Sequence, residues 1–160
     1  AFMGADAVIS AMGVTKSSKD KSALLSANVS NIETAMKKAS VDRLLLTNTV
    51  IASQPGKPAS FLMRFFSWFP GTMGVGAREQ QAVVDAIGNG AFSSFNWTLV
   101  RASVNVKGTD EYPVASKNYD KKLNTWKPVS YRAMGRWMLE EAANNHFVRE
   151  APVVTLRRRK

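Results

Sequence analysis

An apolar run, an amphipathic helix and a second apolar run follow one another near the start of the chain, and this succession constrains the fold more than any other feature. The runs cover residues 5–12 (ADAVISAM) and 41–51 (VDRLLLTNTVI), and each has the length of a strand buried on both faces. Four apolar side chains between them recur at steps of four, three and four residues: Leu25, Val29, Ile32 and Met36. This spacing predicts a helix over 22–39 with one apolar face. Because parallel strands need a crossover of this size, the succession predicts a right-handed βαβ unit.

The same alternation of helix and strand continues to the end of the chain. Further helices are predicted at 76–87 and 130–144, and further strands at 96–104 and 151–156. Ser130 is expected to cap the second of these helices. A chain of 160 residues suits a single core. The sequence therefore predicts one α/β domain over the whole chain, with a parallel sheet and helices packed against it.

Two segments break the alternation. Residues 54–70 contain three prolines and the stretch FLMRFFSWFP, which predicts a long irregular connection. Its aromatic side chains are expected in the core or in a subunit contact, with a lid or a membrane-touching patch as alternatives: Phe65, Phe66, Trp68 and Phe69. Residues 107–128 are polar and weakly periodic, and we expect an excursion beyond the sheet.

Composition narrows the classes of partner and site. A formal charge of +10 favours an anionic partner, but the basic residues are scattered, apart from the block at 157–160. Without a basic-aromatic motif, nucleic-acid binding is the least favoured reading. The chain has no cysteine and one histidine, His146, so we expect no metal site and no disulfide. No apolar run approaches the roughly 20 residues of a membrane span, and a cytoplasmic location is expected.

Four stretches resemble one known family, in that family's order along the chain. They are GADAVISAMG, NVSNIETAMKKASVDRLLLTNT, FNWTLVRAS and PVSYRAMGRWMLEEAANNHFVREAPVV. Together they resemble the carboxyl-terminal portion of the atypical short-chain dehydrogenases and their NmrA-like NAD(P)-binding relatives, although Ala102 stands where proline is usual. The resemblance implies a parallel Rossmann-type sheet that lacks the first βαβαβ half, with NAD(P) as the cofactor.

The sequence departs from that family in two ways. No GxGxxG or GxxGxxG motif occurs, and the glycines of GTMGVG follow a Pro-ended loop, so we do not expect them to hold a phosphate. No tyrosine has a lysine four residues later: Ser116, Leu123 and Gly135 follow Tyr112, Tyr119 and Tyr131. The absent pair weakens the prediction of a dehydrogenase reaction, because the proton donor is missing, but it leaves cofactor binding open.

The resemblance also predicts an open sheet edge. The strand at 5–12 normally pairs with an upstream strand, and an unpaired apolar edge invites aggregation. Our hypothesis is that the chain is a fragment, a processed product or one part of a split domain. Its partner is then a missing amino-terminal segment or another chain that pairs with this strand. NAD(P) binding is expected only when that half is supplied.

Ligands of open parallel sheets bind beyond the carboxyl ends of the strands, which selects the candidate cofactor-binding residues. They are Ser10, Ala11, Met12, Gly13, Thr47, Asn48, Thr49, Arg78 and Arg101. The resemblance places the first four beside the ribose and nicotinamide, against the simpler reading of a tight turn. Thr47, Asn48 and Thr49 are favoured as ligand-facing. For Arg78 the simpler interpretation is a solvated side chain beside Glu79 and no ligand contact. For Arg101 it is an ion pair inside the fold.

No residue is assigned a catalytic role. The leading hypothesis is an NAD(P)-binding protein like the atypical short-chain dehydrogenases, which reduces a small carbonyl, flavin or quinone compound. The alternative is a non-catalytic role, as a dinucleotide-sensing regulator or as a scaffold or assembly subunit, since a fold does not fix a function.

Overall fold

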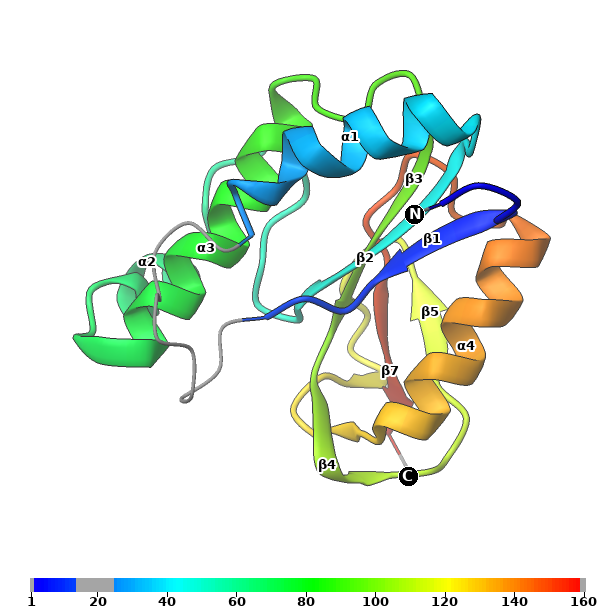
Figure 1. The fold of residues 1–160 in the computed structure, drawn as a ribbon. Coiled ribbons are helices and arrows are strands. Elements are labelled where there is room, and N and C mark those ends of the chain that lie inside the picture. Colours follow the sequence, from blue (N-terminus) through cyan, green and yellow to red (C-terminus); the bar gives the residue numbers. More distant parts are fainter. Residues whose placement is uncertain (1, 14–24, 159–160) are drawn as a thin grey trace.

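The computed structural model describes residues 2–13 and 25–158. Figure 1 shows that these residues form one central sheet with helices on both sides. The elements, in chain order, are β1 (Ala7–Ser10), α1 (Asn28–Ala39), β2 (Arg43–Thr49), α2 (Phe61–Ser67), α3 (Gly71–Gly88), β3 (Asn96–Ala102), β4 (Val104–Thr109), β5 (Val114–Ser116), β6 (Leu123–Asn124), α4 (Tyr131–Asn144) and β7 (Val153–Arg157).

The sheet confirms the predicted α/β class and its parallel core. Its order is β1-β2-β3-β7-β5, and β1, β2, β3 and β7 run parallel to one another. Arg43 lies opposite Ala7 of β1 on one side and Asn96 of β3 on the other, so β2 is paired along both edges. Within the described residues β1 pairs with β2 alone. The fold is Rossmann-like, and its strands meet at one carboxyl edge.

The polar excursion contains strands that the sequence analysis did not predict. β5 and β6 both pair with β7, and both run antiparallel to it. They are only three and two residues long, so neither carries an alternation that a sequence pattern can reveal. The antiparallel pairing extends the sheet beyond its parallel core without changing the order of the parallel strands.

The predicted irregular connection at 54–70 is wrong, because it contains the helix α2. Ser60 caps this helix, and its side-chain oxygen accepts a hydrogen bond from the Met63 amide. Pro70 occupies the N-cap position of α3, which begins at Gly71 and not at residue 76 as predicted. The prolines therefore precede the helices instead of interrupting them, which is where a missing N–H costs least.

Two apolar layers cover the sheet. On one face α1 and α3 pack over Leu44, Leu46 and Leu99, as Figure 1 shows for the helices. On the other face α4 packs over Leu45 and Val100. The predicted apolar face of the first helix is confirmed: Leu25 and Met36 are buried, and Val29 and Ile32 pack against the same cluster. Of the helix predicted over 22–39, residues 22–24 lie outside the described residues. No helix in 2–13 or 25–158 has both the length and the apolar character needed to cross a bilayer.

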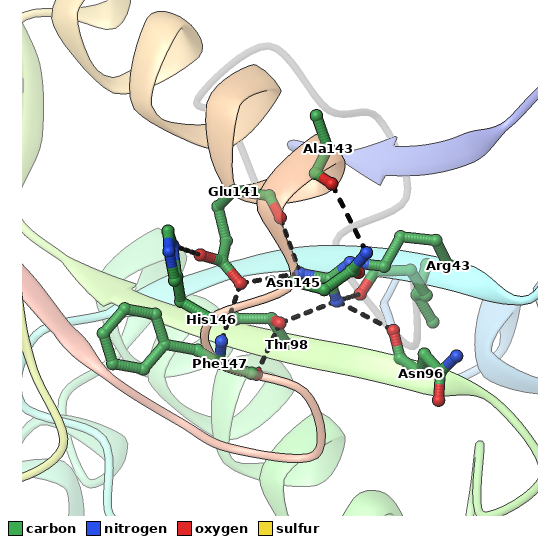
Figure 2. A network of polar contacts seen from close by, with 9 residues as sticks. Arg43, Asn96, Thr98, Glu141, Ala143, Asn145, His146 and Phe147 are labelled. Atoms are coloured by element: carbon green, nitrogen blue, oxygen red, sulfur yellow. Dashed lines mark hydrogen bonds and ion pairs between the residues drawn. The ribbon is translucent and has the colours of Figure 1, made fainter.

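A buried ion pair joins Glu141 of α4 to Arg43, the first residue of β2 (Figure 2). Arg43 Nη2 lies 2.9 Å from Glu141 Oε1, and Arg43 Nη1 donates to Thr98 Oγ1 at 2.8 Å. Glu141 Oε1 also accepts from the Phe147 amide at 2.8 Å, and His146 Nδ1 lies 3.5 Å from Oε2. Burial lowers the pKa of the Arg43 guanidinium, and the charge of Glu141 opposes that effect. The pair fixes the amino-terminal end of β2, opposite the edge where ligands are expected.

Removing one member of this pair leaves the other buried and uncompensated. We expect Glu141→Ala to lower the free energy of unfolding by about 3–5 kcal/mol in chemical denaturation. The matched control is Glu140→Ala on the same helix, because Glu140 bonds the exposed Tyr112 and its loss should cost about 1 kcal/mol or less. Equal losses in the two variants would contradict the assignment.

Candidate functional site

The carboxyl ends of β1 and β2 bring three of the predicted residues together. Thr47 Oγ1 donates to the Ser10 carbonyl oxygen at 3.3 Å. Ser10, Met12 and Thr47 line one small hollow with apolar side chains of α1 and α3, and its volume is about 20 Å³. Such a space holds about one water molecule. Ala11 and Gly13 are exposed beside it, so they can meet a ligand that lies over the edge.

Asn48 is buried and connects β2 to α3. Its Nδ2 donates to the Gln80 carbonyl oxygen at 3.0 Å, and its Oδ1 accepts from the Thr49 amide at 2.7 Å. Both ends of this side-chain amide are therefore used within the fold. Asn48 therefore positions Thr49 and α3 relative to each other.

Thr49 lines a mostly apolar pocket between the end of β2, α2 and α3. Its volume is about 310 Å³, at the lower end of the range for small-molecule sites. The polar wall consists of Thr49 and Gln80, whose Oε1 is buried without a hydrogen-bond partner among the described residues. The apolar wall includes Met63, Phe66 and Met73. The pocket can hold a flat, mainly apolar molecule that carries a few polar atoms.

Gln80 is a site residue that the sequence analysis missed. Four positions on α3 that face this pocket are spaced by three, one and three residues: Met73, Gly76, Ala77 and Gln80. This is the spacing of one helix face, and its small residues leave the space that the pocket occupies. The signal was therefore present, but the helix was predicted to begin at residue 76, so the face was not recognised.

The glycines of GTMGVG lie in the first turns of α3 and not in a phosphate loop. At Gly74 an added Cβ would lie 1.8 Å from the Phe69 carbonyl oxygen, so only glycine allows the close approach between this turn and the end of α2. At Gly76 an added Cβ would meet nothing within 4 Å. Packing therefore requires Gly74, and Gly76 widens the pocket.

Arg78 and Arg101 lie apart from the small hollow and are held by backbone carbonyls. Arg78 is exposed, and its Nη1 donates to the Ser67 carbonyl oxygen at 2.6 Å across the seam of α2 and α3. Its neighbour Glu79 is buried and accepts from the Leu25 and Ser26 amides at 2.8 and 3.1 Å. Glu79 is thus not a solvated partner of Arg78.

The expected internal ion pair of Arg101 is wrong for the described part of the chain. Arg101 is 2% exposed, and its Nε and Nη1 donate to the carbonyl oxygens of Ala151 and Ala52 at 2.8 and 3.0 Å. Its guanidinium lies 5.5 Å from the ring centre of Tyr119. Burial lowers its pKa. These contacts tie β3 to the segments beyond β2 and before β7.

None of the three tyrosines lines the Thr49 pocket. The Tyr119 hydroxyl donates to the Val50 carbonyl oxygen, and the Tyr112 hydroxyl donates to Glu140. Tyr131 is exposed at the start of α4. Partial burial, followed by the hydrogen bond to Glu140, raises the pKa of Tyr112 to about 12. A tyrosine with these partners is not prepared to deliver a proton in the pocket.

A wider hollow of about 500 Å³ lies elsewhere. It is lined by Trp97, Arg149 and Glu150, near the starts of β3 and β7, and by the end of α3. Lys117 and Glu150 form an ion pair beside it. Because it lies toward the amino-terminal ends of the strands, the rule for open parallel sheets favours the smaller Thr49 pocket as the ligand site.

Substitution by alanine is expected to have opposite effects at two glycines of α3, Gly74 and Gly76. Gly74→Ala should lower the free energy of unfolding by about 1–3 kcal/mol, because its Cβ overlaps the Phe69 carbonyl. Gly76→Ala should raise it by about 0.5–1 kcal/mol, since alanine favours the helix and meets open space. Chemical denaturation of both variants tests the geometry, and a stabilising Gly74→Ala would refute it.

The Tyr112 pKa predicts a pH dependence of stability. The folded state holds the neutral phenol more tightly than the unfolded chain does, so the contribution is complete below pH 10.0 and is lost as pH rises through about 12. In a phenolate absorbance titration, Tyr112→Phe should remove the component that ionises last. Tyr131→Phe, at an exposed position, should retain it. A late component that survives Tyr112→Phe would show that another tyrosine carries it.

Comparisons with known proteins agree with this fold. Residues 1–145 match the model of a family described as NAD(P)H-binding. No curated protein matches the chain. A solved structure from Bacillus halodurans, described as an NAD-dependent epimerase/dehydratase, has a TM-score of 0.68 at 14% identity, over 97% of this chain and 66% of that one. The chain thus spans slightly less than two thirds of that relative's length.

Two further structures share the fold. One from Streptococcus pneumoniae, described as an NADH-flavin reductase, has a TM-score of 0.66 at 17% identity, over 96% of this chain and 72% of that one. A short-chain dehydrogenase/reductase from Veillonella parvula in complex with NADP has a TM-score of 0.52 at 14% identity, over 81% of this chain and 58% of that one. At these identities the likeness concerns the fold. With the family model matching most of its length, the chain belongs to the NAD(P)H-binding family.

Proposed function

We propose that the protein is an NAD(P)H-dependent oxidoreductase that reduces a small, flat and largely apolar acceptor of the flavin or quinone class. The observation that carries the proposal is the pocket of about 310 Å³ at the end of β2, whose apolar walls enclose Thr49 and Gln80. Membership of the NAD(P)H-binding family supports the reductant.

The carboxyl edge fits one part of the cofactor. The small residues Ser10, Ala11 and Gly13, with Thr47, suit the approach of a ribose and a nicotinamide over the edge of β1 and β2. The hollow of about 20 Å³ is too small to enclose a ring, so contact is at the surface. The sequence has no glycine-rich fingerprint, so it offers no recognisable turn for the pyrophosphate. When bound, the reduced nicotinamide supplies a hydride.

The chemistry of the pocket favours flavins and quinones over simple carbonyl compounds. Reduction of a carbonyl to an alcohol needs a proton at the oxygen, which enzymes commonly deliver from a placed acid. None of the side chains that line the pocket is acidic or basic: they are Thr49, Ile51, Met63, Phe66, Met73, Ala77 and Gln80, with Gly76. A flavin or quinone is reduced by one hydride from the cofactor and one proton. Water can supply that proton, so the reduction needs no acidic side chain of the protein.

The residues of this chain then bind and orient the acceptor. Thr49 donates its hydroxyl hydrogen to an acceptor carbonyl, and the side-chain amide of Gln80 offers a second donor. Met63, Phe66 and Met73 exclude water from the ring faces. Asn48 holds the two polar residues in register through its bonds to the Thr49 amide and the Gln80 carbonyl.

A turnover assay tests this proposal. NADH or NADPH oxidation is followed with FMN, with menadione and with a small aldehyde, and we expect turnover with the first two acceptors. Thr49→Val and Gln80→Leu should each lower kcat/KM by about fivefold, as expected for one lost hydrogen bond. The matched control is Gln81→Leu, which changes a side chain that lines a different hollow. Turnover of the aldehyde alone, or equal effects of all three substitutions, would contradict the proposal.

One observation favours a second candidate over a reductase of carbonyl compounds: a non-catalytic dinucleotide sensor or assembly subunit. The hydroxyls of Tyr112 and Tyr119 are engaged by Glu140 and Val50, so no tyrosine near the described edge is available as a proton donor. NADPH fluorescence that responds to the protein, with no turnover of any acceptor, would favour this candidate.

We propose in addition that the free edge of β1 accepts a further strand. In the described residues β1 pairs with β2 alone, and an open apolar edge is a template for pairing. The strand comes from an amino-terminal segment or from another chain. Light scattering on the 160-residue chain tests this, because a well-behaved monomer would refute it.

A further inference from the structure

The outer face of α2 carries exposed aromatic side chains. Phe61, Phe65 and Trp68 follow at steps of four and three residues, which places them on one face of the helix. Phe61 is 79% exposed and Trp68 is 86% exposed. Only the opposite face of the helix packs inward, through the buried Met63. Phe69 and Met73 extend the same exposed surface toward α3, and these five residues together are called the α2 patch.

Three aromatic side chains of the α2 patch are packed against one another. The ring centres of Phe65 and Phe69 lie 5.1 Å apart in an edge-to-face arrangement, and those of Phe61 and Phe65 lie 6.3 Å apart. These three rings therefore form a continuous apolar surface, and Trp68 is exposed on the same face of the helix. Contiguous exposed patches on soluble domains mark interaction sites.

The charges around the α2 patch are mainly positive, although Asp85 lines a hollow together with Arg64 and Arg78. The sequence from residue 43 to residue 78 contains no aspartate or glutamate, while Lys57, Arg64 and Arg78 lie within it. Arg64 sits on α2 between Phe61 and Phe65 and is exposed. An apolar face with aromatic rings and flanking basic side chains is the pattern of helices that lie in the interface of an acidic bilayer. The formal charge of +10 acts in the same direction.

The place of the α2 patch in the fold distinguishes a bilayer from a second copy of the chain. Figure 1 shows α2 and the first turns of α3 at one end of the molecule, away from the sheet, where they project. A symmetric dimer through this patch would bring the basic side chains of both copies to one interface, where like charges repel. A bilayer with acidic headgroups supplies the opposite charge, and it can deform around this projecting end of the molecule.

We infer that the α2 patch docks the protein onto the surface of membranes that contain anionic lipids. The aromatic rings insert at the boundary of headgroups and acyl chains, while Arg64 and Lys57 remain among the headgroups. The helix is only seven residues long, so it lies on the membrane and does not cross it. The inference is independent of the proposed oxidoreductase function.

Vesicle co-sedimentation tests the inference with variants that keep the net charge. The vesicles are pure phosphatidylcholine, or equal parts phosphatidylcholine and phosphatidylserine. We expect the wild-type chain to bind only the mixed vesicles, with weaker binding as salt increases. The double variant Phe65→Ser, Trp68→Ser should bind them about tenfold more weakly, since it loses two inserting rings.

The matched control is Trp126→Ser, which removes another exposed tryptophan, 68% exposed, from outside α2. It should bind as the wild type does. Circular dichroism checks that both variants are folded. As a second readout, lipids brominated near the headgroup should quench tryptophan emission of the wild type, and most of this quenching should disappear in Trp68→Phe.

Three outcomes would overturn the inference. The first is that the wild-type chain does not bind the mixed vesicles. The second is equal binding by the double variant, which would assign any membrane affinity to the scattered basic residues. The third is a dimer by light scattering that becomes monomeric in the double variant without vesicle binding, which would make the α2 patch a contact between copies.

Discussion

The pairing of β2 along both of its edges is the constraint on which the rest of the structure depends. Its backbone bonds to β1 and β3 in parallel, so the carboxyl ends of three strands meet at one edge. A parallel sheet has both faces buried, which requires apolar layers on each side. Helices α1 and α3 supply one layer and α4 supplies the other. The charged pair of Arg43 and Glu141 secures the opposite end of the same strand.

The candidate site follows from where β2 ends. Thr47 is held against Ser10 of the neighbouring strand, and Thr49 extends into the space left by the glycine and alanine of α3. The polar atoms at the edge are mostly engaged within the fold, as the contacts of Asn48 and Arg101 show. What remains open to a ligand is therefore a mainly apolar pocket, which favours acceptors that bind by shape and need few hydrogen bonds.

The sequence predicts the parts of the fold that repeat a pattern and misses the parts that depend on single contacts. The apolar runs and the spacing of Leu25, Val29, Ile32 and Met36 predict the parallel core correctly. Helix α2 does not follow from the sequence pattern because prolines flank it, although these prolines precede the helix starts and do not interrupt the helices. The partners of Glu79 and Arg101 lie 53 or 54 and 49 or 50 residues away, so no local pattern reveals them. For the candidate site, Ser10, Thr47 and Thr49 follow from the ends of the predicted strands, whereas Gln80 follows only from the start of α3.

The shared amide of Asn48 makes the two polar walls of the pocket mechanically dependent on each other. A ligand that displaces α3 moves the carbonyl of Gln80. Because Asn48 bonds to both residues, the backbone of Thr49 moves with it. The polar half of the pocket thus behaves as one stiff unit. Met63 and Phe66, which belong to the short helix α2, are the side chains that can adjust to ligands of different width. Changes in α2 can therefore broaden or narrow the range of molecules accepted while the hydrogen-bonding geometry stays constant.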